Sequence, residues 1–214
     1  MPEPAAPVPE GSVQAVLWDA DGVLQHLPAG WEASMRPVVA GHVDDVDGFL
    51  AEAFEAERPA LVGEASWLDI LPRLLDRWEV PQLYDRALEV WVTIVPQDEV
   101  RALVGELRGH GVPGYLATNQ TEHRGRYMAE HLGYDDLLDG AFWSYEMGLA
   151  KPDPAYFTAI ADRLGLAASQ LLLVDDSPRN VAAARSVGLA AELWHVDEGL
   201  PALRALLRRH GLPA

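Results

Sequence analysis

Cysteine is absent from this chain of 214 residues, which excludes disulfides, thiolate nucleophiles and cysteine-ligated metal clusters. No apolar run reaches the roughly 18 residues that a membrane-spanning helix needs, so no membrane partner is expected. Positive charge is also scarce, because 33 acidic side chains outnumber 16 basic ones and give a formal net charge of −17. A field of this sign repels nucleic acids and anionic surfaces, so no nucleic-acid partner is expected either.

Lysine occurs once, at Lys151, and all the other residues counted as basic are arginines. Lysine is a compact point charge and arginine is a planar fork, so the two are not interchangeable in a tight site. A genomic bias toward arginine would explain the scarcity of lysine. It would not explain why the single lysine stands directly before Pro152-Asp153-Pro154. We therefore predict a functional role for Lys151.

The first half of the chain divides into three segments. Residues 1–12 are rich in proline and lack the basic and apolar regions of a signal peptide, so we expect a flexible lead and a cytoplasmic location. Residues 13–24 begin with an apolar run that predicts a buried strand. Residues 25–95 repeat apolar side chains at helical spacing, which predicts a small inserted α-helical cap. Pro72 is expected to kink or divide one of its helices.

Helix and strand patterns alternate from residue 96 onward. Strands are expected at 112–117, 141–144, 171–174 and 191–196, and helices at 97–110, 122–132, 153–164, 178–187 and 200–209. Such alternation predicts a parallel sheet with helices on both faces, which is a Rossmann-like three-layer α/β/α fold. The expected core therefore consists of residues 13–24 and 96–214, and the cap of residues 25–95.

Four polar clusters follow predicted strands, where open parallel sheets bind their ligands. They are Asp19-Ala20-Asp21-Gly22, Thr118-Asn119, Lys151-Pro152-Asp153, and Asp175-Asp176 with the later Asn180. Each cluster alone also fits an ordinary turn or helix cap, because Asp, Asn, Gly and Thr favour both. The functional interpretation depends on all four occurring together.

Together the clusters predict a metal site. If the strand ends share one edge of the sheet, four carboxylates converge there: Asp19, Asp21, Asp175 and Asp176. Clustered carboxylates repel one another, and a hard divalent cation relieves that repulsion. Oxygen ligands of this kind suit magnesium, which also accepts a phosphate oxygen. Lys151 would then add local positive charge beside the phosphate of a small-molecule substrate.

These motifs, in this order and spacing, resemble those of the haloacid dehalogenase-like hydrolase superfamily, in its branch with a helical cap after the first motif. The resemblance spans roughly residues 13–207. It implies a phosphatase in which Asp19 attacks phosphorus to form an aspartyl-phosphate, and Asp21 acts as general acid and base. It also implies magnesium held by Asp19, the backbone carbonyl of Asp21, and Asp176.

The resemblance assigns further roles. Thr118 and the backbone of Asn119 would bind the phosphoryl group, while Lys151 would stabilise its charge. Asp175 is a candidate for orienting Lys151. Asn180 stands where many relatives have an aspartate, and this departure resembles a branch that is sugar-phosphatase-like and epoxide-hydrolase-N-domain-like. A sugar phosphate is therefore the favoured substrate.

Three residues are candidates for the substrate pocket. Trp31 lies just beyond the first motif, where a cap would face the site. His123 and Arg124 follow the second motif, although such residues more often form a solvated helix face. A cap would close over the site and exclude water.

Other functions stay open. Asp21 argues against dehalogenation, because true dehalogenases of the superfamily lack this second aspartate. A phosphomutase of the same superfamily shares the first motif. A catalytically idle binding or regulatory module is also compatible with the fold. The sequence indicates no oligomeric state.

Overall fold

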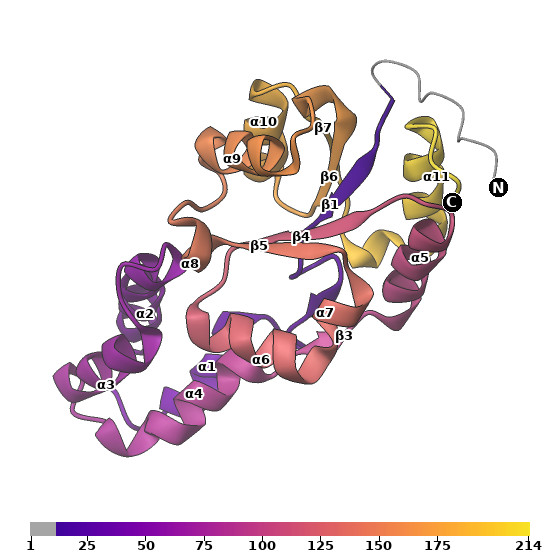
Figure 1. Cartoon of the computed structure of the whole chain (residues 1–214). Helices are drawn as coiled ribbons and strands as arrows, with labels where there is room; N and C mark the ends of the chain where they lie inside the picture. Colours follow the sequence, from indigo (N-terminus) through magenta and orange to yellow (C-terminus); the bar gives the residue numbers. More distant parts are fainter. Residues whose placement is uncertain (1–11) are drawn as a thin grey trace.

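A five-stranded parallel sheet forms the centre of the structure, a computed structural model that describes residues 12–214 (Figure 1). The strands are β1 (Ala15–Trp18), β4 (Gly114–Thr118), β5 (Gly140–Trp143), β6 (Leu171–Asp175) and β7 (Ala190–Leu193), in the order β5-β4-β1-β6-β7. The central strand β1 thus lies between β4 and β6. The predicted lead at residues 1–12 lies outside the described residues, except for Ser12.

Helices cover both faces of the sheet. Figure 1 shows α9 (Pro154–Leu164) and α10 (Pro178–Ser186) on one face. The other face carries α5 (Asp98–Gly109), α6 (Glu122–Leu132), the short α7 (Tyr134–Leu137) and α11 (Leu200–Arg209). Along β1, Val16 and Trp18 pack with α5 and α11, whereas Ala15 and Leu17 pack with α9 and α10. Both faces of the strand are therefore buried, as expected for a parallel sheet between two helical layers. The predicted three-layer fold is confirmed.

The segment at residues 25–95, which ends before α5, contains four α-helices with a hydrophobic cluster of their own. They are α1 (Trp31–Val39), α2 (Val46–Leu61), α3 (Trp67–Arg77) and α4 (Tyr84–Val92), with a short 3₁₀ turn at Pro81–Leu83. Two short strands, β2 (Gln25–His26) and β3 (Val95–Pro96), pair antiparallel at its two ends. Sequence patterns missed this pair, because two-residue strands show no periodicity. We refer to residues 25–95 as the insert, and its status as a separate cap domain stays a prediction.

Helix α3 continues through Pro72 without interruption. Pro72 therefore does not divide the helix, and a kink at this position stays a prediction. Four buried side chains on both sides of the proline pack into the hydrophobic cluster of the insert: Trp67, Leu71, Leu74 and Leu75. This packing outweighs the hydrogen bond that proline removes.

The remaining elements are short. Helix α8 (Ser144–Met147) follows β5, and 3₁₀ turns occur at Ala168–Gln170 and Val196–Glu198. Among the helices within residues 12–214, none combines the length and the apolar character needed to cross a membrane.

Candidate active site

The carboxyl ends of three neighbouring strands meet at one edge of the sheet. Asp19 follows β1, Thr118 ends β4, and Asp175 ends β6 with Asp176 next to it. Because these strands are parallel and adjacent, residues far apart in the sequence come together here. Oxygens of Asp19, Asp175 and Asp176 all lie within 4.8 Å of one another.

Lys151 joins two of these carboxylates. Its Nζ lies 2.8 Å from Asp19 Oδ1 and 2.7 Å from Asp175 Oδ2, and the residue is only 5% exposed. Burial alone would lower the pKa of the ammonium group, but the carboxylates of Asp19 and Asp175 hold that pKa above its ordinary value. The single lysine of the chain is therefore a charged group in contact with the predicted nucleophile.

Asn119 holds the backbone of Lys151 from both sides. Its Nδ2 donates to the Lys151 carbonyl at 2.7 Å, and the Lys151 N–H donates to Asn119 Oδ1 at 2.8 Å. This pair of hydrogen bonds fastens the loop after β4 to the loop that carries the lysine. The side chain of Asn119 thus positions Lys151, in addition to the backbone role predicted from the sequence.

Asp175 is fully buried, and its hydrogen bonds indicate that it positions Lys151. One carboxylate oxygen binds Lys151, while the other accepts from the Ser177 N–H and from Asn180 Nδ2, both at 2.9 Å. Asn180 therefore supports Asp175, which in turn orients Lys151. This leaves Asp19 and Asp176 as the carboxylates of the cluster with room for a cation.

The cluster fits a divalent metal ion. Burial, and then the nearby Asp175, raise the pKa of Asp176. Burial raises the pKa of Asp19 well above its usual range, although Lys151 opposes this shift. A Cβ atom at Gly22 would lie 2.3 Å from Asp176 Oδ2, so only glycine, here with φ +79°, lets the first loop approach this carboxylate. The single ammonium group of Lys151 does not offset the repulsion among these carboxylates. A hard cation that takes oxygen ligands would offset it.

The Asp21 carboxylate does not join this cluster, so the expected convergence of all four carboxylates is wrong. It binds the guanidinium of Arg124 instead, with Nη1 2.5 Å from Oδ2 and Nη2 2.8 Å from Oδ1. Burial alone would raise the pKa of Asp21, but Arg124 and hydrogen bonds from Gln25 and Gln120 lower it below the ordinary value. Asp21 is therefore held as a carboxylate by Arg124, and it lines the same cavity as Asp176.

Two glutamines at the site were missed by the sequence reasoning. Gln120 Nε2 donates to Asp21 Oδ2 and to Thr118 Oγ1, both at 3.0 Å. Gln25 Nε2 donates to Asp21 Oδ1 at 3.1 Å and Gln25 Oε1 accepts from Tyr134 at 2.7 Å. Both glutamines are almost fully buried. Their positions directly after the first two motifs were the only available signal.

A family model of the haloacid dehalogenase-like hydrolases matches residues 13–188. This chain belongs to that family. A phosphoglycolate phosphatase of Rhodospirillum rubrum is 29% identical over 192 residues, which cover 82% of this chain and 77% of that protein. A sesquiterpene phosphatase of Aspergillus oryzae is 33% identical over 105 residues, which cover 49% and 53% of the two chains.

Solved structures agree on the fold. A haloacid dehalogenase family enzyme from Bacteroides thetaiotaomicron superposes with a TM-score of 0.78 at 18% identity, over 90% of this chain and 98% of the other. The same enzyme in a magnesium complex gives a TM-score of 0.76 at 19% identity with the same coverage. The protein is therefore a haloacid dehalogenase-like hydrolase, and the relatives named above are phosphatases.

The hydrolase has a cavity of about 480 Å³ beside the strand ends. The α/β core contributes Asp21, Asn119, Arg124 and Asp176 to its lining, and the insert contributes Trp31, Phe54, Glu57 and Trp91. Two of the three predicted pocket residues, Trp31 and Arg124, thus line the same cavity as Asp21 and Asp176.

His123 is the third predicted pocket residue, and it does not line this cavity. Its side chain is half-buried, and burial, followed by Arg126, lowers its pKa. It lies next to Arg124 on α6, but successive residues of a helix point about 100° apart. That spacing explains why only Arg124 faces Asp21.

Arg124 also connects the core to the insert. Its Nε donates to the Trp91 carbonyl of α4 at 2.7 Å, and Trp91 Nε1 donates to Glu57 Oε1 of α2 at 2.7 Å. A continuous path of hydrogen bonds therefore runs from Asp21 through Arg124 and Trp91 to Glu57.

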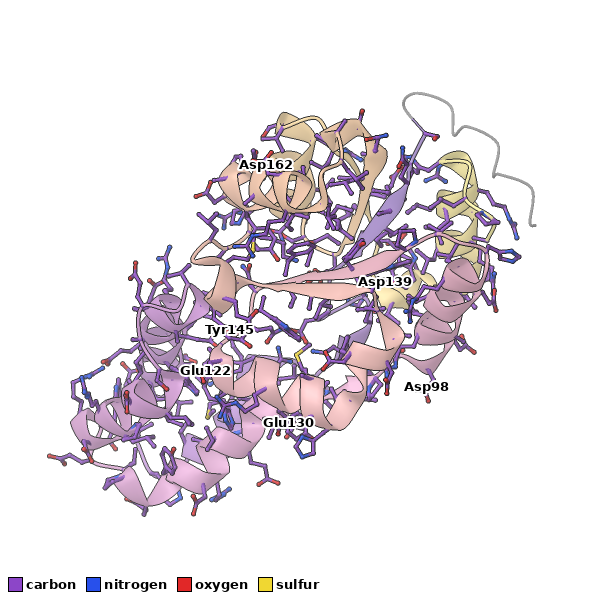
Figure 2. The ribbon with its side chains drawn as sticks, in the orientation of Figure 1. Asp98, Glu122, Glu130, Asp139, Tyr145 and Asp162 are labelled. Carbon is purple, nitrogen blue, oxygen red and sulfur yellow. The ribbon has the colours of Figure 1, made fainter. Side chains whose placement is uncertain are left out.

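A second groove, of about 770 Å³, lies between the insert and α6. Figure 2 labels Glu122, Glu130 and Tyr145, which line it. Asp19, Asp21, Thr118, Lys151, Asp175 and Asp176 do not line this groove. It is therefore separate from the site described above.

Proposed function

We propose that this hydrolase is a magnesium-dependent phosphatase that cleaves a small phosphorylated metabolite through an aspartyl-phosphate on Asp19. The observation that carries the proposal is the contact of Lys151 Nζ with Asp19 and Asp175, beside Asp176. A nucleophilic carboxylate, a fixed cation and a candidate metal site thus share one buried place. The phosphatase names of its relatives support the same reaction.

Asp19, Asp176 and the backbone carbonyl of Asp21 would hold the magnesium ion, whose charge would offset that of the phosphoryl oxygens. Lys151, Thr118 and the Asn119 backbone would contact the same oxygens. In the first step an Asp19 oxygen bonds to phosphorus while the bond from phosphorus to the ester oxygen breaks. The leaving oxygen would take its proton from Asp21. In the second step water attacks phosphorus, Asp21 accepts the proton, and free phosphate and the Asp19 carboxylate result.

The ion pair with Arg124 suits the second of these roles. It favours the ionised form of Asp21, which is the form that accepts a proton from water. To donate a proton in the first step, Asp21 must first take one up, and Arg124 opposes this. We infer that the Asp21–Arg124 contact loosens when substrate enters and re-forms for hydrolysis.

A sugar phosphate is the proposed substrate class. The support is the Asn180 departure in the fourth motif, together with a cavity whose insert side carries Trp31, Phe54 and Trp91. Aromatic faces pack against the C–H face of a sugar ring. The cytoplasmic location expected from the sequence stays a prediction.

A screen of phosphorylated metabolites and one aryl phosphate, with and without magnesium, tests the proposal. We expect magnesium-dependent release of phosphate, at least about 10³-fold reduced in the Asp19→Asn variant. Brief reaction followed by acid quenching should leave one phosphoryl group on the wild-type chain and none on the variant. A phosphomutase would return an isomer of the substrate rather than free phosphate. No turnover of any phosphate by the folded protein in magnesium would favour the binding module instead.

A further inference from the structure

One acidic residue stands on the insert side of the cavity. Glu57 belongs to α2 and lines the cavity together with three aromatic residues of the insert: Trp31, Phe54 and Trp91. The Trp31 and Trp91 rings pack edge to face with centroids 5.5 Å apart, and Trp31 and Phe54 lie 6.5 Å apart. The insert side is therefore a continuous aromatic surface with a single carboxylate in it.

Glu57 is fixed but only half satisfied. Its Oε1 accepts from Trp91 Nε1 at 2.7 Å. Its Oε2 receives no hydrogen bond from any donor within residues 12–214. Burial is the main cause that raises the pKa of Glu57, so the surroundings do not favour its charge. A carboxylate kept in such a place has one free acceptor beside the space that a leaving group would fill.

The arginine and lysine side chains near this space already have partners. Arg124 is the only arginine or lysine, among the described residues, that lines the cavity. Its terminal nitrogens bind Asp21 and its Nε binds the Trp91 carbonyl. Lys151 lies between Asp19 and Asp175. A second anionic group on the substrate would therefore meet Glu57 and Asp21 without a free arginine or lysine to pair with.

We propose that Glu57 is a specificity-determining residue that rejects phosphate esters with an anionic leaving group and accepts those whose leaving group carries uncharged hydroxyls. The inference rests on the proposed phosphatase function. A hydroxyl of the leaving group donates to Oε2, and its carbon skeleton packs on the aromatic surface. A carboxylate in the same position is repelled by Glu57 and meets no uncommitted arginine or lysine among the described lining residues. The phosphoglycolate acted on by relatives of this name would thus be a poor substrate here.

A matched pair of substrates tests this. Glycerol 3-phosphate and 3-phosphoglycerate differ only in a hydroxymethyl group against a carboxylate at the end remote from phosphorus. We expect wild-type kcat/KM to favour glycerol 3-phosphate by about tenfold or more, since one like-charge contact in a partly buried site reaches that size. The Glu57→Gln variant keeps an acceptor but loses the charge. Its kcat/KM values for the two esters should therefore differ by less than about threefold.

Glu55→Gln is the matched control. Glu55 lies on the same helix, its side chain is 63% exposed, and it pairs with Arg58 rather than lining the cavity. Its variant should keep the wild-type ratio. A wild-type enzyme that cleaves both esters equally well, or a Glu57→Gln variant with an unchanged ratio, would overturn the inference.

A binding measurement tests the role of Glu57 independently of the proposed phosphatase activity. Calorimetric titration of the two esters into the Asp19→Asn variant in magnesium should show the same preference without turnover. If wild type cleaves neither ester nor any aryl phosphate, the phosphatase proposal fails, and the preference in binding still decides the role of Glu57. Equal binding of the two esters would reject that role even if the enzyme is an active phosphatase.

Discussion

Arg124 binds both carboxylate oxygens of Asp21, at 2.5 and 2.8 Å, although the two residues are 103 positions apart in the sequence. Arg124 is 8% exposed, and its guanidinium has several hydrogen-bond partners. Its Nη1 also donates to Gln120 Oε1 at 2.8 Å, and its Nε donates to the Trp91 carbonyl at 2.7 Å. The predicted acid/base of the core is thus linked to a helix of the insert through one side chain.

Replacing Arg124 should impair catalysis, although Arg124 is not one of the residues predicted to bind the phosphate. Arg124→Leu leaves Asp21 and the Trp91 carbonyl without their donor, and we expect kcat/KM to fall about 100-fold, or about 3 kcal/mol. Arg124→Lys keeps the charge but cannot bind two carboxylate oxygens and the carbonyl together, so a fall of about tenfold is expected. Steady-state kinetics on the best substrate of the metabolite screen measures both.

Arg126→Leu is the control for these variants. Arg126 is on the same helix, its side chain is 63% exposed, and it pairs with Glu122 at the surface. Its loss should change kcat/KM by less than about twofold, because exposed ion pairs contribute little. Equal effects of the Arg124 and Arg126 variants would show that the contact with Asp21 has no catalytic importance.

Magnesium should stabilise the fold as well as support turnover. An ion that binds only the folded protein raises the free energy of unfolding by about 2.7 kcal/mol at a concentration 100 times its dissociation constant. We therefore expect added magnesium to raise the melting temperature by roughly 5–10 °C and chelation to reverse this. The shift should be lost in Asp176→Asn and kept in Asp197→Asn, where the carboxylate is 88% exposed. A full magnesium shift in the Asp176 variant would contradict the assigned metal site.

Much of this site could be predicted from the sequence, because its residues directly follow strands that the sequence identifies. Short apolar runs identified β1, β4 and β6, and the polar residues that follow them had to meet once the strands were adjacent and parallel. Lys151 was singled out by its rarity. The structure places it between Asp19 and Asp175, and its functional role stays a prediction.

Contacts between distant elements were not predictable. Asp21 was expected to join the other carboxylates, but a strand end does not determine which way the next side chains turn. Its partner lies on α6, and a helical residue after a motif is ordinarily exposed. Glu57 carried even less signal, because it is one of many acidic residues in helices of the insert. Only the packing of α2 and α4 brings it beside Trp91 and the cavity.

Trp31 should influence which substrate is preferred. It lines the cavity and packs on Trp91 and Phe54, so its ring forms part of the surface offered to a leaving group. We expect Trp31→Ala to lower kcat/KM for ring-bearing sugar phosphates about tenfold, with a smaller loss for a short ester such as glycerol 3-phosphate. Trp78→Ala, which removes a tryptophan of the insert that does not line the cavity, controls for general loosening of the helices. If the ranking of substrates is the same in Trp31→Ala and wild type, the ring has no role in selection.

The Glu57→Gln variant should be more stable than wild type at high pH, because wild type loses stability as the pH rises and the variant does not. Burial raises the pKa of Glu57 above that of the unfolded chain, so the folded state holds this proton more tightly. The resulting stability is complete below the ordinary glutamate pKa of about 4.3 and is lost as the pH rises through the folded-state pKa. Glutamine has no charge to bury and should still accept from Trp91 Nε1.

The melting temperatures of wild type and Glu57→Gln should therefore agree near pH 4 and separate above it. At about pH 8 we expect the variant to melt roughly 2–4 °C higher, which corresponds to about 1 kcal/mol for a chain of this size. Glu55→Gln should show no such pH-dependent difference, because its carboxylate is exposed on the same helix. A Glu57→Gln variant that melts below wild type at pH 8 would mean that attraction to Arg124 outweighs burial. A gain in stability combined with a loss of discrimination between the two glycerol esters would show that this carboxylate is retained for selecting substrates and not for holding the helices together.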